Sequence, residues 1–442
     1  MPTTDVRTLH IVVLATLDTK GPEAAFVADL IRARGHRVSI LDVGVIGESP
    51  VAPDIDRTQV MEAAAMAPSH LPSLRRDQVM DAMGRGAGVL LRRMGERGEL
   101  DGVLAVGGNQ GTAIAGIALE QLPIGLPKVV VSTVASGNIR PYIGHRDIAM
   151  VFSVADILGG PNTITRTILS NAAGAVVGMG EMGIPLSRPR DRKVIAVTAL
   201  GNTNPVVTRA GAMLEELGYE VVTFHASGAC GSAMEELIDQ GMFDAVLDLT
   251  THELVGEVFG DDIYTPTRPG RLESAGRRGI PMVVAPGGME YFCFGPLETV
   301  PSKYLGRAIH HHNPFNMNVR ASAGEMGELG RAVASKLNLA RGPVLFLLPS
   351  KGWSIVGAPG GPLHDPDANQ AFVRALKTNL APEVRLEEID ATINDPAVAD
   401  RAVEFIHTAL KSAPGPVPDV VPGETEPASP AGDDATQRGM SE

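Results

Sequence analysis

Three short segments of small and polar residues each follow an apolar run, and their residue types are suited to binding an anion. They are Thr16–Gly21, Gly107–Thr112 and Thr133–Asn138. In the second segment a glycine-rich turn separates an apolar run from a helix-like run, which lets backbone N–H groups at a helix start approach an anion closely. Asp18 adds a carboxylate suited to Mg²⁺, and Lys20 adds an ammonium suited to a phosphate. The pattern predicts a nucleotide-phosphate site.

A simpler interpretation of the same residues stays open. Glycine turns corners because it tolerates positive φ, Asp18 is suited to capping a helix, and Lys20 to lying in solvent. The motifs G-x-x-x-x-G-K-[ST] and G-x-G-x-x-G are both absent from these segments. The candidate cofactor-binding residues are Asp18, Thr19, Lys20, Gly107, Gly108, Asn109, Gly111, Thr112, Thr133, Ser136 and Gly137.

The second half of the chain carries a different set of polar residues after its apolar runs. A histidine, a glutamate, an arginine and a lysine at strand ends would supply an acid, a base and a clamp for a small carboxylate or keto acid. These candidate catalytic residues are His225, Glu253, Arg320 and Lys351. For His225 and for His252, a role as a hydrogen-bonded core residue is an equal alternative. No metal ligand is assigned, because the adjacent residues His310–His312 point in different directions, and Cys230 and Cys293 are interpreted as small buried residues.

The apolar runs and helix-like segments that position these residues alternate along the chain. Strands are expected at Leu9–Ala15, Val38–Val43, Gly102–Val106 and Lys128–Ser132, with helices near Pro22–Arg34, Asp77–Arg97 and Thr163–Val177. A polar segment from Gly47 to Pro72 is expected to be a loop. The order then starts again at Lys193, and Gly218–Val221 echoes Gly35–Val38.

This repetition predicts an α/β protein with two Rossmann-like, doubly wound domains, mainly parallel sheets and an internal duplication. The expected domains are 1–190 for nucleotide and 191–411 for a substrate or partner, followed by a disordered, acidic, proline-rich tail at 412–442. In the second half, Leu249–Glu253 takes the place of the glycine turn.

Composition narrows the class of protein further. The net charge of −13 over 442 residues argues against a nucleic-acid surface, and two cysteines give neither a disulfide framework nor a zinc cluster. Leu9–Leu14 is too short to span a membrane. We therefore expect a soluble cytoplasmic protein without a nucleic-acid or membrane partner.

Several motifs resemble one known family over most of the chain. They are Thr16-x-Asp18-Thr19-Lys20, Gly107-Gly108-x-x-Gly111-Thr112, Ser132–Gly137, Phe224-His225-Ala226-x-Gly228, Ala233–Glu235 and Phe294–Pro296. They look like the Tm-one-like ATP-binding domain family of bacteria, fungi and plants, which includes the tomato inhibitor of tobamovirus RNA replication. The resemblance implies ATP, with Mg²⁺ as a possible companion, at the loops of the first domain, and a homodimer. It places the nucleotide contacts on Asp18, Thr19, Lys20, Gly107, Gly108, Gly111, Thr112, Thr133 and Ser136.

Three functions are compatible with these observations. The first is a cytoplasmic ATP-binding protein with nucleotide in the first domain and a small metabolite between the domains. The second is a metabolic enzyme that acts on a small carboxylate or keto acid with His225, Glu253, Arg320 and Lys351, the nucleotide being regulatory. The third is a nucleotide-sensing interaction module without catalysis.

Overall fold

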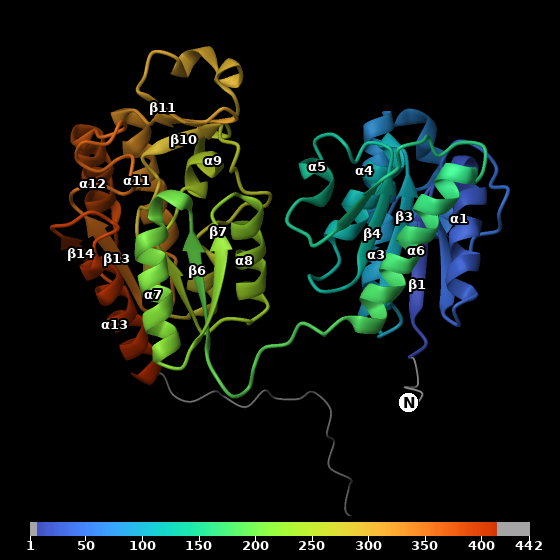
Figure 1. Cartoon of the computed structure of the whole chain (residues 1–442), viewed down its shortest axis with the longest axis horizontal. Coiled ribbons are helices and arrows are strands. Elements are labelled where there is room, and N and C mark those ends of the chain that lie inside the picture. The colour runs from blue at the N-terminus through green and yellow to red at the C-terminus, as the bar shows by residue number, and fades with distance from the viewer. Residues whose placement is uncertain (1–6, 413–442) are drawn as a thin grey trace, which may run out of the picture.

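The structure, a computed structural model, describes residues 7–412 and consists of two α/β domains (Figure 1). The first domain holds a five-stranded sheet in the order β2-β1-β3-β4-β5, with every neighbouring pair parallel. Its strands are β1 (His10–Ala15), β2 (Arg37–Asp42), β3 (Gly102–Gly107), β4 (Lys128–Ser132) and β5 (Ala149–Phe152). β1, β3 and β4 are buried along their whole length, as expected for a parallel sheet covered on both faces.

Helices cover both faces of the first sheet. α1 (Leu17–Arg32) and α6 (Thr163–Met182) pack on one face, while α2 (Arg57–Ala63), α3 (Arg76–Glu96) and α4 (Asn109–Glu120) pack on the other. The short helix α5 (Arg140–Ile143) follows β4, and a 3₁₀ turn, η1 (Pro68–Ser73), precedes α3. α3 lies close to α4 because glycines face it: a Cβ at Gly84 would lie 2.6 Å from Cβ of Ile117.

The second domain repeats the plan with one more strand. Its parallel sheet has the order β7-β6-β8-β9-β13-β14, which matches β2-β1-β3-β4-β5 strand for strand before the extra edge. The strands are β6 (Val194–Ala199), β7 (Glu220–His225), β8 (Ala245–Asp248), β9 (Met282–Val284), β13 (Val344–Pro349) and β14 (Arg385–Ile389). The predicted fold of two mainly parallel α/β domains is confirmed, and the matching strand order is what a duplicated unit would give.

The helices of the second domain also form two layers. α7 (Asn204–Glu216) and α13 (Pro396–Ser412) cover one face; α8 (Ala229–Asp239), α9 (Glu253–Phe259), α10 (Ser274–Arg278), α11 (Ala323–Leu337) and α12 (Pro366–Asn379) lie on the other side. A small antiparallel sheet, β10-β12-β11, is added at one end (Figure 1). It comprises β10 (Tyr291–Phe294), β11 (Ile309–Asn313) and β12 (Asn316–Arg320), and the 3₁₀ turns of this domain are η2 (Gly201–Thr203), η3 (Leu297–Thr299) and η4 (Ser302–Tyr304).

Two local features differ from the sequence-based expectation. The segment expected to be a loop contains α2, which starts at a reciprocal cap: the Asp56 side chain accepts from the Gln59 amide, and the Gln59 side chain from the Asp56 amide. The small antiparallel sheet was not predicted, because strands of four or five residues give too little periodicity to read. The tail expected at 412–442 lies outside the described residues beyond Ser412.

Side chains from the segment around α5 join the two domains. The Arg140 guanidinium donates to the carbonyls of Ile263 and Thr265, the latter at 2.6 Å. Arg146 and His145 both contact the Glu236 carboxylate on α8, at 2.5 and 2.9 Å. The domains therefore dock through directional polar contacts.

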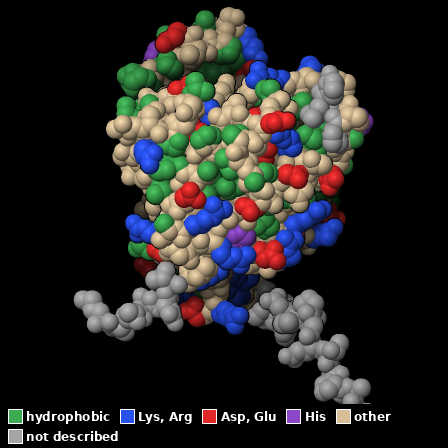
Figure 2. All heavy atoms as spheres, turned by 90° about the vertical axis from the view of Figure 1, so that its right-hand side faces the viewer, with side chains coloured by type: hydrophobic (Ala, Val, Ile, Leu, Met, Phe, Trp, Pro, Cys, Tyr) green, Lys and Arg blue, Asp and Glu red, His purple; other side chains and the backbone are tan. Residues whose placement is uncertain are grey.

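In the part of the chain that the structure describes, no helix has the length and apolarity needed to cross a membrane. Figure 2, which faces the first domain, shows acidic, basic and apolar side chains interspersed over that surface.

Candidate functional site

A cavity of about 540 Å³ lies at the carboxyl ends of β1 and β3 in the first domain. β1 pairs with both β2 and β3, so the chain leaves these neighbouring strands toward opposite faces of the sheet. Open α/β sheets bind ligands at such a switch point, because the diverging loops leave a crevice there. The cavity is lined by residues of the loops after β1, β2 and β3 together with the start of α3.

The start of α4 forms one wall of this cavity. Gly108 is the N-cap of α4, and no side chain caps the N–H groups in the first turn of this helix. The glycine at 107 is required for packing, since a Cβ there would lie 2.7 Å from the carbonyl carbon of Gly111. At Gly108, by contrast, a Cβ would meet only Thr133 Oγ1, at 3.8 Å. Gly108 therefore lines the cavity at a position where an added Cβ would have room.

Two cationic side chains line the same cavity. Lys20 comes from the first turn of α1, and Arg76 is the first residue of α3. Among residues 7–412, neither forms an ion pair or a hydrogen bond through its side chain. Positive charge beside an uncapped helix start favours a bound anion.

Asp18 and the two threonines of the first loop hold the shape of the cavity. The Asp18 carboxylate accepts from the Ile46 amide at 3.0 Å, which anchors the loop after β2 over the start of α1. The hydroxyls of Thr16 and Thr19 lie 3.0 Å apart. Lys20 departs from helical geometry (φ −127°, ψ 15°), so the first turn of α1 is a distinct loop-like segment before Pro22.

Apolar side chains form the remaining wall. They come from the loop after β2, from α3 and α4, and from the segment after β5: Val43, Val45, Ile46, Val79, Met80, Met83, Ile114 and Leu158. Ile46 and Leu158 are largely exposed, at 77% and 68%. A cavity lined both by apolar side chains and by cations beside a helix start suits a ligand with an uncharged aromatic part and an anionic part.

The other candidate cofactor-binding residues take different positions. Asn109 and Gly111 line the cavity, whereas the buried Thr112 hydroxyl is engaged with Ser132 Oγ at 2.7 Å and with the Gly108 carbonyl at 2.8 Å. Thr133 lies beside Gly108, and Ser136 and Gly137 are exposed in the loop after β4. Thr112 therefore stabilises the glycine loop through the hydrogen bonds of its hydroxyl.

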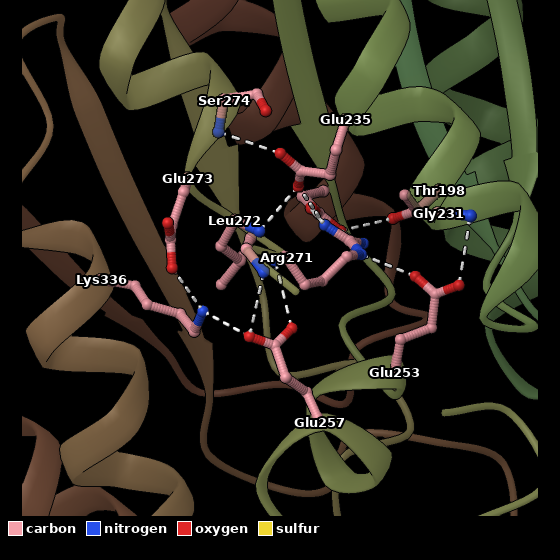
Figure 3. Close-up of polar contacts among 12 residues, drawn as sticks. Thr198, Gly231, Glu235, Glu253, Glu257, Arg271, Leu272, Glu273, Ser274 and Lys336 are labelled. Atoms are coloured by element: carbon pink, nitrogen blue, oxygen red, sulfur yellow. Dashed lines mark hydrogen bonds and ion pairs between the residues drawn. The ribbon is translucent and has the colours of Figure 1, made fainter. Parts of the chain in front are cut away.

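The four candidate catalytic residues of the second domain do not converge. Glu253 is fully buried: it pairs with Nε of Arg271 at 2.6 Å and accepts the Gly231 amide (Figure 3). It also accepts the Gly228 amide. Arg271 also pairs with Asp248 and Glu235. Burial by itself would lower the pKa of Arg271, but the three carboxylates raise it well above the usual value. Glu253 belongs to a closed ionic network that ties α8, α9 and β8 together.

The other three lie apart from Glu253. The buried Arg320 guanidinium donates to the carbonyls of Glu290 and Asp365 and to Asn369 Oδ1, at 2.6 Å for the last. Lys351 is exposed and pairs with Asp390 at 3.0 Å. His225 lines a small cavity of about 180 Å³ beside β10 and β12.

A further cavity, of about 450 Å³, lies where the domains meet. Its walls come from α4 and the segment around α5 in the first domain and from Thr265–Thr267 in the second.

Sequence reasoning did not include Arg76 or the apolar wall of the first cavity. Arg76 lies in a run of charged residues at a helix start, where a solvated side chain is the ordinary outcome. The apolar residues read as core because their spacing is that of core residues. Only the return of α3 toward the β1–β3 edge brings them to the site.

The fold and the site define a two-domain α/β protein with parallel sheets and a ligand-sized cavity at the switch point of the first. The chain belongs to the uncharacterised protein family UPF0261: the N-terminal domain model of this family matches residues 9–184 and the C-terminal domain model matches residues 192–410.

Relatives from bacteria and a plant are similar over most of the chain. A UPF0261 protein of Clostridium tetani is 39% identical over 87% of this chain and 95% of its own length. The RA0729 protein of Rhizobium meliloti is 36% identical over 89% of this chain and 97% of its own. The ToMV resistance protein Tm-1(GCR237) of Solanum lycopersicum is 31% identical over 93% of this chain, which corresponds to 57% of the tomato protein. The family resemblance stated from the motifs is confirmed.

Solved structures show only weak similarity. The UDP-GlcNAc 2-epimerase of Methanocaldococcus jannaschii in complex with UDP-GlcNAc and UDP is 10% identical, covers 84% of this chain and 100% of its own, and has a TM-score of 0.21. A UDP-N-acetylglucosamine 2-epimerase from Listeria monocytogenes gives a TM-score of 0.22 at 12% identity over 63% of this chain and 79% of its own. Nothing about ligand or activity follows from similarity at this level.

Proposed function

We propose that this protein binds ATP in the cavity at the carboxyl ends of β1 and β3. The phosphates would lie against the glycine loop and the start of α4, with Lys20 and Arg76 as counter-charges. The adenine and ribose would lie on the apolar wall formed by the loop after β2 and by α3. The family resemblance carried by the motifs at Thr16–Lys20 and Gly107–Thr112 supports ATP among the nucleotides.

One observation carries the proposal. A single cavity at the switch point joins an uncapped helix start, two cations without side-chain partners among residues 7–412, and an extended apolar wall. Its volume of about 540 Å³ lies within the range of about 300–1,000 Å³ that is usual for small-molecule sites. An anionic ligand without an aromatic part would leave that wall in water.

Asp18 is the residue in this cavity suited to a magnesium ion. Mg²⁺ keeps most of its waters in nucleotide sites and is held by one or two carboxylates together with the phosphates. The Asp18 side chain already accepts an amide of the loop after β2, so a contact through water would preserve that anchor. ATP would then bind as its magnesium complex.

Isothermal titration of the full chain with ATP and Mg²⁺ tests the proposal. We expect saturable binding of one nucleotide per chain, with weaker binding of adenosine and of inorganic tripolyphosphate, because each fills only one part of the cavity. Absence of heat at millimolar ATP would refute ATP binding. Equal affinity for ATP and tripolyphosphate would show that the apolar wall holds no base.

The dimeric state and the cytoplasmic location stay predictions of the resemblance and of the composition.

A further inference from the structure

Three side chains with metal-binding atoms meet inside the second domain, away from the ATP cavity. His252 lies just before α9, Asp262 lies in the loop after it, and Cys293 lies in β10. One ligand atom of each lies within 4.8 Å of the others, and all three residues are buried. The exposed fractions are 0%, 6% and 4%.

The hydrogen bond of the His252 ring fixes which nitrogen faces the cluster. Nδ1 lies 2.6 Å from the Gly288 carbonyl oxygen, which can only accept, so Nδ1 carries the proton. Nε2 is then the atom turned toward Asp262. A backbone carbonyl on the other ring nitrogen is the usual orienting contact of a metal-bound histidine.

Nε2 forms no aligned hydrogen bond in the described part of the chain, although it is buried. It lies 3.2 Å from Asp262 Oδ2, within ion-pair distance, and the Cys293 side chain is its other polar neighbour. Two ligands bound tetrahedrally at about 2.0–2.1 Å lie a little over 3 Å apart. The approach of Nε2 and Oδ2 fits two atoms aimed at a common point better than a direct hydrogen bond.

The other two ligands are also held from outside the cluster. The Asp262 carboxylate accepts the Cys293 amide through Oδ2 at 2.5 Å and the Tyr264 amide through Oδ1 at 2.7 Å. The Asn318 amide donates to Cys293 Sγ at 3.1 Å, which fixes the position of the sulfur atom. The ligand atoms are therefore fixed by backbone and amide contacts in a rigid, buried setting.

A cavity borders the cluster on the Cys293 side. It has a volume of about 180 Å³, and besides Cys293 and Asn318 it is lined by polar groups that include Asn202, His225, Tyr264 and His312. Three protein ligands beside a small cavity is the arrangement of a metal site with one open position.

We propose that His252 Nε2, Asp262 Oδ2 and Cys293 Sγ bind a divalent transition-metal ion of the zinc class, with a fourth position open to the small cavity. The donor set of one imidazole, one carboxylate and one thiolate suits Zn²⁺ better than Mg²⁺ or Ca²⁺, which prefer oxygen. A dication also balances the thiolate and the carboxylate, so the buried site carries no net charge. The proposal is independent of ATP binding in the first domain.

The small number of cysteines makes a spectroscopic test decisive. Co²⁺ takes the place of Zn²⁺ in such sites and gives a thiolate-to-cobalt charge-transfer band in the near ultraviolet. The chain has only two cysteines, Cys230 and Cys293, so only two residues can be the source of this band.

Bound metal is first removed from the full chain with a chelator. The metal-free protein is titrated with Co²⁺, and the bound Co²⁺ is then displaced with Zn²⁺. We expect one equivalent of Co²⁺ with a charge-transfer band that is lost on adding Zn²⁺. Cys293→Ser is nearly isosteric and should abolish the band, whereas Cys230→Ser should retain it at full intensity. His252→Gln should weaken Co²⁺ binding at least tenfold, since ligand loss is more severe than the tenfold to hundredfold effect of losing an outer partner.

The absence of stoichiometric Co²⁺ binding would overturn the proposal. A band that survives Cys293→Ser, or that disappears with Cys230→Ser, would overturn it equally. In either case His252 and Asp262 would form a buried ion pair that serves only the fold. If Cys293→Ser fails to give native circular dichroism, the Cys230→Ser protein alone decides, because its single thiol either gives the band or does not.

Discussion

At the scale of single residues, the first-domain cavity has two kinds of polar residue. Some would contact a ligand, and others hold the loops in place. Lys20 has no side-chain partner among residues 7–412, whereas Asp18 and Thr112 are both engaged with the protein. The cationic lining of the cavity therefore depends on Lys20 and Arg76.

Lys20→Ala is expected to weaken ATP about tenfold or more, since a charge-assisted hydrogen bond contributes about 1.5–3 kcal/mol. Adenosine, which has no phosphate, should lose little affinity. Lys351→Ala removes an exposed lysine of the second domain and serves as the control in the same calorimetric titration. Equal losses for ATP and adenosine would show that Lys20 does not contact phosphate.

A substitution at Glu253 distinguishes a catalytic role of this residue from a structural one. Removing one partner from a buried ion pair leaves an uncompensated charge, which lowers the free energy of unfolding by about 3–5 kcal/mol. We expect Glu253→Gln to lower the free energy of unfolding in urea by at least about 2 kcal/mol, because the neutral amide keeps some hydrogen bonds. Glu404→Gln, which alters an exposed pair, is the control. A stable Glu253→Gln protein would contradict the structural role.

At the scale of elements, the long buried strands and the amphipathic helices could be predicted from the sequence. α6 is an example: the helix expected near Thr163–Val177 does begin at Thr163, because Asn162 caps its start and its apolar residues recur at helical spacing. The glycine loop after β3 and the segment after β1 were also placed correctly at neighbouring strand ends. Local patterns were sufficient there.

The rest could not be predicted because it depends on contacts distant in sequence. Nothing local shows that Glu253 meets Arg271, or that Arg320 is held by Asp365 and Asn369. His252 and Cys293 are separated in the sequence by α9, α10 and β9, and only the folded chain brings them together. Single polar residues near strand ends look alike in sequence whether they line a cavity or close a network.

The contact between α3 and α4 gives a prediction at this scale. A Cβ at Gly84 would lie 2.6 Å from Ile117 Cβ and 3.0 Å from the Ile114 carbonyl oxygen, so Gly84→Ala forces the helices apart. We expect a loss of about 1–3 kcal/mol in the free energy of unfolding, typical of overpacking. Gly95→Ala, in the same helix with no atom within 4 Å of its Cβ, should be neutral or stabilising by up to about 1 kcal/mol. Similar effects of the two changes in urea unfolding would disprove close packing here.

At the scale of the whole molecule, Glu236 connects the two domains. Burial by itself would raise the pKa of Glu236, but the hydrogen bonds and charges of His145 and Arg146 lower it to about 2. The Gln240 amide also donates to this carboxylate at 3.0 Å. Because the pKa is lower in the docked state than the usual 4.5, docking is favoured above about pH 4.5 and this contribution is lost as the pH falls toward 2.

Glu236→Gln should therefore loosen the docking of the domains at neutral pH. We expect a larger radius of gyration by small-angle X-ray scattering, while Glu328→Gln, an exposed residue of α11, leaves it unchanged. The radius of the wild-type protein should grow only as the pH falls below about 4.5. A variant with wild-type dimensions at neutral pH would show that Arg140 and its carbonyl partners suffice to hold the domains.

The central claim, ATP in the first-domain cavity, is tested most directly by calorimetric titration of Gly108→Val with ATP and Mg²⁺. A Cβ at 108 would meet no atom closer than 3.8 Å, so the added side chain should leave the fold intact, and because Gly108 lines the cavity we expect it to occupy the space of the phosphates. Gly174→Val, on the exposed side of α6 with no atom within 4 Å of its Cβ, is the matched control. We predict saturable ATP binding by the wild-type protein and by Gly174→Val, and its loss in Gly108→Val with unchanged circular dichroism. Undiminished ATP binding by a folded Gly108→Val protein would contradict the claim.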